Sequence, residues 1–90
     1  MTVDIREMEK ILKALANRRR LAIVKYLHRV KEANVGTIAG EIRLSFAATS
    51  RHLGILYVAD LLEREQTSTS MNYSLAQPLH PALKVVLQIL

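Results

Sequence analysis

The 90-residue sequence has no cysteine, two prolines, three glycines and a single phenylalanine. The lack of cysteine excludes disulfides and metal sites built from thiolates. No apolar run approaches the roughly 18 residues that a membrane span requires, and the first ten residues, MTVDIREMEK, are too charged for a signal peptide. We therefore expect a cytoplasmic protein.

Residue patterns typical of enzymes are also missing. There is no phosphate-binding glycine loop, no nucleophile beside a base and no convergent set of carboxylates, so we expect no enzymatic activity and no cofactor. The three histidines, His28, His52 and His80, fall on different predicted elements without ligand spacing, so we expect no metal. One phenylalanine and three tyrosines offer few rings for stacking on unpaired bases, which argues against RNA or single-strand binding.

Half of the residues are hydrophobic, which is enough to build one core in a single domain spanning residues 1–90. Thirteen basic against eight acidic side chains leave a net charge of +5, which favours an anionic partner. This excess lies in residues 1–36, which hold nine basic and four acidic side chains, whereas residues 37–90 are neutral. A nucleic-acid surface in the second part alone should therefore bind weakly.

Hydrophobic spacing predicts three helices in the first half of the chain. Asp4 followed by Glu7 resembles a capping box, Asn17 is the expected N-cap of the second helix, and a short third helix is expected over 37–42. The stripes expected to face the core are Ile5, Met8, Ile11, Leu12 and Leu15, then Leu21, Val24, Leu27 and Val30. The outer face of the second helix is either a solvated surface or a phosphate-facing patch; it carries Arg18, Lys25, Arg29 and Glu32.

A fourth helix is predicted after a tight turn at Arg43 and Leu44, with Ser45 as its N-cap. Its inward face should consist of Thr49, Leu53 and Leu56, which are spaced at i, i+4 and i+7. The outward surface near the helix start is small and polar, as expected of a surface that approaches another molecule closely. It comprises Phe46, Ala47, Ala48, Ser50, Arg51 and Gly54.

The segments LLEREQ and MNYSL flank the polar tetrad Thr67–Ser70, which predicts a two-stranded hairpin. His80 followed by Pro81 is typical of the N-cap and first position of a last helix. This short helix is apolar on two sides, so we expect dimerisation through the terminal helices, residues 4–16 and 80–90. The residues expected at the interface are Ile5, Met8, Leu12, Leu83, Val86, Leu87 and Leu90.

Two helices joined by a tight turn and followed by a hairpin indicate a winged helix-turn-helix, mainly α, with about five helices and a two-stranded β-hairpin wing. The segments LKALANRRRLAIVKYL, VGTIAGEIRLSFAATSRHLGILYVADLL and NYSL resemble the ArsR-type family of repressors, over about residues 11–75. The most specific match is a pattern met by Leu44, Ser45, Ser50, Arg51, His52, Leu53 and Leu56.

This resemblance implies a homodimeric transcriptional regulator, expected to be a repressor, whose fourth helix enters the major groove of double-stranded DNA. The residues expected at the DNA are Thr37, Ser45, Phe46, Ala47, Ala48, Ser50, Arg51, His52, Arg64, Thr67, Ser68 and Thr69. For His52 a buried, hydrogen-bonded role is the alternative. The alternative function is a winged-helix module for protein interaction or dimerisation with weak or no DNA binding.

The sequence departs from the family pattern at several positions. Phe46, Ala47 and Ala48 replace residues that are usually polar, and Thr49 stands where a buried aliphatic side chain is usual. Gly54 replaces a frequent lysine, while Arg43 and Asp60 replace glycines of left-handed turns, where strain or a different turn is expected. The cysteine pairs and histidine–carboxylate sets of metal-sensing members are missing, so a member without metal sensing is expected.

Overall fold

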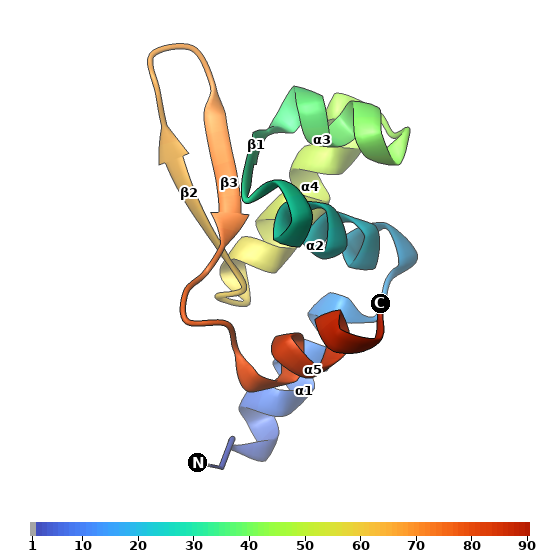
Figure 1. Cartoon of the computed structure of the whole chain (residues 1–90), viewed down its shortest axis with the longest axis vertical. Coiled ribbons are helices and arrows are strands. Elements are labelled where there is room, and N and C mark those ends of the chain that lie inside the picture. Colours follow the sequence, from blue (N-terminus) through green and yellow to red (C-terminus); the bar gives the residue numbers. More distant parts are fainter. Residues whose placement is uncertain (1) are drawn as a thin grey trace.

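The computed structural model describes residues 2–90 (Figure 1). Within them, no helix is both long and apolar enough to cross a membrane. The chain forms five helices and three strands: α1 (Ile5–Leu15), α2 (Arg18–Val30), β1 (Glu32–Asn34), α3 (Val35–Ile42), α4 (Phe46–Val58), β2 (Leu62–Gln66), β3 (Met71–Leu75) and α5 (Pro81–Ile89). Figure 1 shows the β2–β3 hairpin at one end of the long axis and the paired helices α1 and α5 at the other.

The predicted helix starts at Asn17, Ser45 and His80 are confirmed. Each of these side chains accepts a hydrogen bond from a backbone N–H in the first turn of its helix, which satisfies donors that would otherwise lack a partner. Asp4 also caps α1, by accepting from the N–H of Arg6. Glu7 does not close a capping box as predicted, because its carboxylate pairs with the ring of His80.

The sheet has three strands rather than the predicted two, in the order β1-β3-β2, with both pairings antiparallel. The segment between α2 and α3, in which the sequence showed only an interruption, pairs Ala33 with Tyr73 as β1. The third helix begins at Val35, two residues before the predicted start, because the side chain of Asn34 caps it by accepting from the N–H of Thr37. β1 thus anchors the wing to the helical body.

Three residues other than glycine among residues 2–90 have positive φ: Lys31 (φ 78°), Arg43 (φ 56°) and Asp60 (φ 63°). The sequence predicts strain or a different turn at Arg43 and Asp60; both keep a positive φ without glycine, so strain is the alternative that is present. Arg43 ends α3, and the next N–H, that of Leu44, donates to the carbonyl of Ala39. This turn sets the angle at which α4 leaves α3.

All five helices and the sheet enclose one core. Leu53 and Leu56 of α4 are fully buried against Ile23 and Leu27 of α2, and Tyr73 and Leu75 of β3 close one side. The predicted stripe on α1 divides into two, because Ile11 and Leu15 are buried while Ile5 and Leu12 are exposed. Leu83 of α5 is also fully buried, so it belongs to the core.

Thr49 is the one polar residue among the buried residues between 2 and 90, and its hydroxyl has no hydrogen-bond partner there. Thr49→Val keeps the shape and removes the unsatisfied hydroxyl, whose burial costs about 1–3 kcal/mol. We expect this substitution to raise the free energy of unfolding by about 1–2 kcal/mol. Chemical denaturation checks this, with Thr37→Val on the exposed side of α3 as the control; an unchanged or lower stability for Thr49→Val contradicts it.

Candidate nucleic-acid interface

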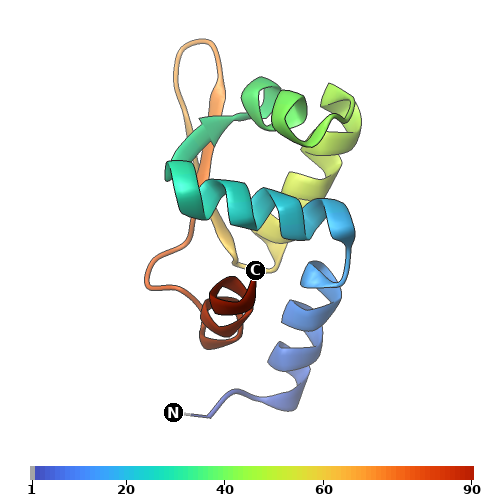
Figure 2. The ribbon, with the colours of Figure 1, turned by 45° about the vertical axis from the view of Figure 1, so that its right-hand side comes forward.

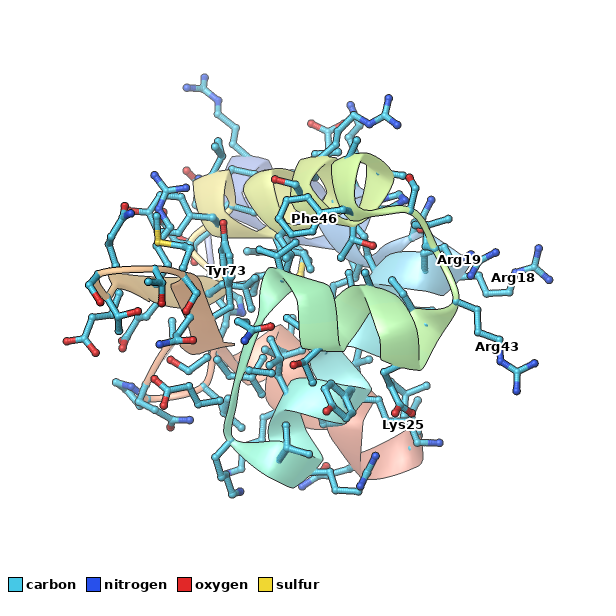
Figure 3. All side chains as sticks on the ribbon, turned by 90° about the horizontal axis from the view of Figure 1, so that it is seen from above. Arg18, Arg19, Lys25, Arg43, Phe46 and Tyr73 are labelled. Carbon is cyan, nitrogen blue, oxygen red and sulfur yellow. The ribbon has the colours of Figure 1, made fainter. Side chains whose placement is uncertain are left out.

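One face of helix α4 packs into the core, and the opposite face is exposed to solvent. Thr49, Leu53 and Leu56 lie in the core as predicted, so the residues between them in sequence point away from the domain. In the first two turns, Phe46 is 63% exposed and Ala47, Ser50 and Arg51 are exposed, whereas Ala48 is half-buried. The predicted outward surface at the helix start is therefore exposed at Phe46, Ala47, Ser50 and Arg51, and Figure 3 shows the ring of Phe46 upon it.

His52 lies at the side of α4 that faces α1 and α2, where it is half-buried. Its Nδ1 is 3.1 Å from Nη1 of Arg20. Because a guanidinium can only donate, Nδ1 accepts and the ring proton lies on Nε2. The alternative expected for this histidine, a hydrogen-bonded structural role, is thus present. The Nε2–H group remains available to donate a hydrogen bond to a phosphate oxygen.

The pKa of His52 is lowered from its usual 6.5, first by burial and then by the positive charges of Arg20, Arg51 and Arg19. Both causes disfavour the imidazolium, so the ring is neutral at pH 7. A neutral ring is also what the hydrogen bond from Arg20 requires, since a protonated Nδ1 could not accept it.

Arg20 joins three elements. Besides His52 on α4, its guanidinium donates to the carbonyls of Ala14 and Lys13 at the end of α1. Arg19 has a similar use, because it donates to the carbonyls of Ile42 and Arg43 at the end of α3. These two arginines stabilise helix ends, which the basic row in the sequence did not indicate.

Arg18 and Arg43 extend outward from one edge of the molecule, beside the turn that leads into α4 (Figure 3). Both residues are exposed, and neither forms an ion pair with a carboxylate of residues 2–90. Arg43 was not among the expected DNA contacts, because the sequence pattern drew attention only to its backbone. Its exposure beside the start of α4 makes it a candidate phosphate contact.

The outer face of α2 beyond Arg18 is a solvated surface. Lys25 lies apart from Phe46, toward the lower right of Figure 3. Arg29 approaches the carboxylate of Glu41 at 3.9 Å and lies over the ring of Tyr26, 5.2 Å from its centroid. Of the two readings of this basic face, the structure therefore favours the solvated one for Lys25 and Arg29.

The wing carries four of the expected contacts, and two of them, Arg64 and Thr67, have partners within the domain. The guanidinium of Arg64 lies over the ring of Tyr57, 3.8 Å from its centroid, at the end of α4. The hydroxyl of Thr67 donates to the carbonyl of Ser70 within the turn. Ser68 and Thr69 at the tip are exposed and uncharged, and Arg64 is the one basic side chain of residues 62–75, so the wing offers little positive charge.

Thr37, the remaining expected contact, is exposed on α3. The start of α4 and the wing tip both lie at the same end of the long axis (Figure 1), while α1 and α5 lie at the other end. The structure therefore groups Ser45, Phe46, Ala47, Ser50 and Arg51 on one surface, with the wing to one side.

Helices α1 and α5 lie side by side (Figures 1 and 2), joined by a hydrogen bond of 2.7 Å between Nε2 of His80 and the carboxylate of Glu7. Both helices carry exposed apolar side chains beside their charged ones. Leu12 is 51% exposed, and Ile5, Val85, Ile89 and Leu90 are exposed as well. Val86 and Leu87 are half-buried against the core, and Met8 is half-buried.

The surface left for a partner is thus not the stripe expected on α5. Leu83 has no exposed surface, so its assignment to the dimer interface is wrong. The helix turns its Leu83 side to its own domain, which leaves Val85 and Ile89 outside. Elsewhere, no three histidine, aspartate or glutamate side chains of residues 2–90 gather closely enough to hold a metal ion.

A helix-turn-helix with an exposed second helix and a sheet-anchored hairpin defines the winged helix-turn-helix class. The sequence profile described as "Bacterial regulatory protein, arsR family" matches residues 17–64, more than half of the chain. The chain belongs to the arsR family. This family consists of regulatory proteins rather than enzymes.

Solved structures with the same fold include regulators from several bacteria. HlyU from Vibrio cholerae N16961 is 28% identical with a TM-score of 0.81, covering 99% of this chain and 92% of that one. The transcriptional repressor PagR of Bacillus anthracis is 25% identical with a TM-score of 0.79, covering 94% and 93%. A homodimeric winged helix-turn-helix DNA-binding domain from Mycobacterium bovis is 24% identical, with a TM-score of 0.82 and coverage of 99% and 86%. No curated protein sequence matches the chain.

Proposed function

We propose that this protein is a homodimeric transcriptional regulator that binds double-stranded DNA sequence-specifically and acts as a repressor without a metal ion. The observation that carries the proposal is the start of α4, where Ser45, Ala47, Ser50 and Arg51 form an exposed surface of small and hydrogen-bonding groups. Membership of the arsR family and the likeness to the repressor PagR support it.

In this proposal Arg51 reads a base or clamps a phosphate in the major groove, because a guanidinium can pair with guanine through two hydrogen bonds. Ser45, Ser50 and His52 donate to phosphate oxygens, and Arg18 and Arg43 add positive charge beside the turn. Ala47 and Phe46 can contact thymine methyl groups. Because the wing, residues 62–75, carries one arginine against two glutamates, the helix and these two arginines supply most of the affinity.

The proposed dimer buries the apolar outer sides of α1 and α5. Ile5, Leu12, Val85, Ile89 and Leu90 together leave an apolar area on one end of the domain, and such contiguous areas mark association surfaces. A two-fold axis at this end would place the two α4 helices on one side of the dimer, about 34 Å apart, as two successive major grooves require. The homodimeric Mycobacterium domain of the same fold is consistent with this arrangement.

The first test is Arg51→Ala. Its side chain is exposed, so the substitution should leave the fold intact, yet we expect it to weaken specific binding by about 1–3 kcal/mol and to relax the sequence preference at one base pair. Fluorescence anisotropy with a selected operator and its single-base variants measures both. Lys25→Ala, at an exposed residue of α2 apart from the start of α4, is the control. Unchanged affinity and preference for Arg51→Ala would remove this residue from the DNA surface.

A module for protein interaction is the second candidate, favoured by the exposed ring of Phe46 and the neutral wing tip. The two candidates differ in how Phe46→Ala behaves on DNA. For a DNA reader, the substitution changes affinity only for sites with a thymine opposite the helix start. For an interaction module, the wild-type protein binds all DNA equally weakly, and the substitution changes nothing.

A further inference from the structure

A groove of about 680 Å³ lies between α1 and the second half of α4 and adjoins, at Arg51, the surface proposed to read DNA. Its floor is apolar and consists of Ala14, Gly54, Ile55, Val58 and Ala59. Val58 is 74% exposed, and no atom lies within 4 Å of where a side chain on Gly54 would begin. An apolar hollow of this volume is within the usual range of small-molecule sites.

The rim of the groove is positively charged. Arg6, Lys10 and Lys13 recur along α1 at helical spacing, and Arg51 contributes from α4. The single carboxylate of the lining, that of Glu9, lies 3.7 Å from Lys13, and Lys10 lies 3.5 Å from Asp60. Both pairs are exposed and therefore weak. Among residues 2–90, neither the Arg6 nor the Arg51 guanidinium has a carboxylate within ion-pair distance.

We propose that this groove binds a small organic anion with an aliphatic body, of the fatty-acid class, and that the bound anion competes with DNA for Arg51. The aliphatic chain lies on Ile55 and Val58, and the carboxylate lies between Arg6 and Arg51. The competition rests on the proposed function; the binding itself does not.

Charge complementarity favours a small organic anion over two other occupants, a DNA backbone and a second copy of the chain. A DNA backbone would satisfy the rim but would cover Ile55 and Val58 with phosphates, which gain nothing from apolar contact. A second copy that packed groove against groove across a two-fold axis would bring the same cations face to face. An amphipathic anion satisfies both parts of the groove at once.

The consequence for regulation follows from the position of Arg51. This residue follows Ala47 by one turn and precedes Gly54 and Val58 on the same outward stripe of α4, so it stands between the DNA surface and the groove. A carboxylate that engages its guanidinium removes a DNA contact. Because the two ligands then compete, the anion lowers DNA affinity and DNA lowers the affinity for the anion.

The experiment titrates the DNA-free protein with dodecanoate, below the concentration at which it forms micelles, and follows binding by calorimetry and by NMR shifts. Dodecyltrimethylammonium, with the same chain and the opposite charge, is the matched probe. We expect saturable binding of dodecanoate, one per chain, and binding of the cation weaker by about tenfold or more, because its head group meets like charges.

Three variants locate the site. Val58→Asp puts a charge on the floor of the groove, Gly54→Leu fills the groove, and Arg6→Gln removes one partner of the carboxylate. The first two substitutions should each lower the affinity for dodecanoate by about tenfold or more. Ala22→Asp, an exposed site on α2, adds the same charge elsewhere and should leave binding unchanged. With operator DNA present, dodecanoate should release the wild-type protein but not Gly54→Leu.

The outcomes separate this proposal from the proposed function. Saturable dodecanoate binding by a protein that binds no DNA supports the groove and contradicts the function. DNA binding without saturable dodecanoate binding overturns the groove alone, as does dodecanoate binding that Val58→Asp and Gly54→Leu leave unchanged. A Val58→Asp protein that becomes monomeric while the wild type is dimeric would show that a second copy occupies the groove, and this too overturns the proposal.

Discussion

Leu12→Glu and Ile89→Glu, each made alone, are expected to convert a dimer into a monomer at micromolar concentration. Both side chains are exposed in the single chain, Leu12 by 51% and Ile89 by 81%, so a carboxylate there stays solvated and the domain still folds. In the proposed dimer the same carboxylate would be buried without a partner, which is costly. We expect operator affinity to fall on the order of a hundredfold, because the two recognition helices no longer act together.

Light scattering and anisotropy measure the two effects, and circular dichroism confirms that each variant is folded. Leu87→Glu is a poorer choice, because Leu87 packs against the core and its replacement would mix unfolding with dissociation. Ala22→Glu, on the exposed face of α2, is the matched control and should stay dimeric. Variants at Leu12 and Ile89 that remain dimeric would place the interface elsewhere.

Arg20→Met is the second substitution with a large expected effect. Its guanidinium satisfies the carbonyls of Ala14 and Lys13 and holds the ring of His52, and the methionine side chain can do neither. Hydrogen bonds from charged groups contribute about 1.5–3 kcal/mol, so we expect the free energy of unfolding to fall by roughly 2–3 kcal/mol. Denaturation at one fixed protein concentration measures this, since a dimer's stability depends on concentration.

Arg18→Met is the matched control, because Arg18 is exposed and the change should lie within about 0.5 kcal/mol of zero. Equal effects of Arg18→Met and Arg20→Met would contradict the structural role of Arg20. Nitrogen NMR shifts of the His52 ring give a second readout: the wild type should show the proton on Nε2, and Arg20→Met a mixture of both neutral forms.

His52 also makes stability depend on pH. Its pKa is lowered in the folded protein, by burial first and by Arg20 next, so below about pH 6.5 the unfolded chain binds more protons than the folded one. The part of the folding stability that depends on neutral His52 is therefore present above about pH 6.5. It falls as the pH drops below that value. His52→Gln should flatten this decline. A decline of equal steepness in His52→Gln would assign it to other groups.

The local features of the fold were predictable because they depend on neighbouring residues. Asn17, Ser45 and His80 cap helices through short side chains that reach the next turn, and Thr49, Leu53 and Leu56 face inward because their spacing follows the helical repeat. At Arg43 and Asp60 the missing family glycines predict strain or a different turn, and both residues have positive φ, which is the strained alternative.

The features that were missed depend on residues far apart in the sequence. β1 has three residues and no alternating pattern of its own, and it is a strand only because β3 lies beside it. The bond between Arg20 and His52 joins residues 32 positions apart. The orientation of α5 is another such case: its two apolar stripes look alike in sequence, and only packing buries Leu83 and leaves Ile89 outside.

The candidate site was predicted only in part, because some of its features depend on local helix periodicity and others on tertiary contacts. The outward surface of α4 follows from its inward residues, so Ser45, Phe46, Ala47, Ser50 and Arg51 were expected there and are exposed. Whether an arginine is free or engaged depends on tertiary contacts, which is why Arg19 and Arg20 proved to bind helix ends while Arg43 is free.

The most direct test of the central claim is a selection of double-stranded DNA by the wild-type protein from a random library at physiological salt. A dimeric winged-helix regulator should enrich an inverted repeat whose two half-sites are centred about one helical turn, or roughly 34 Å, apart. Binding to that site should be about a thousandfold or more tighter than to unselected DNA. A library that shows no enriched sequence, with equally weak binding to every fragment, would contradict the account.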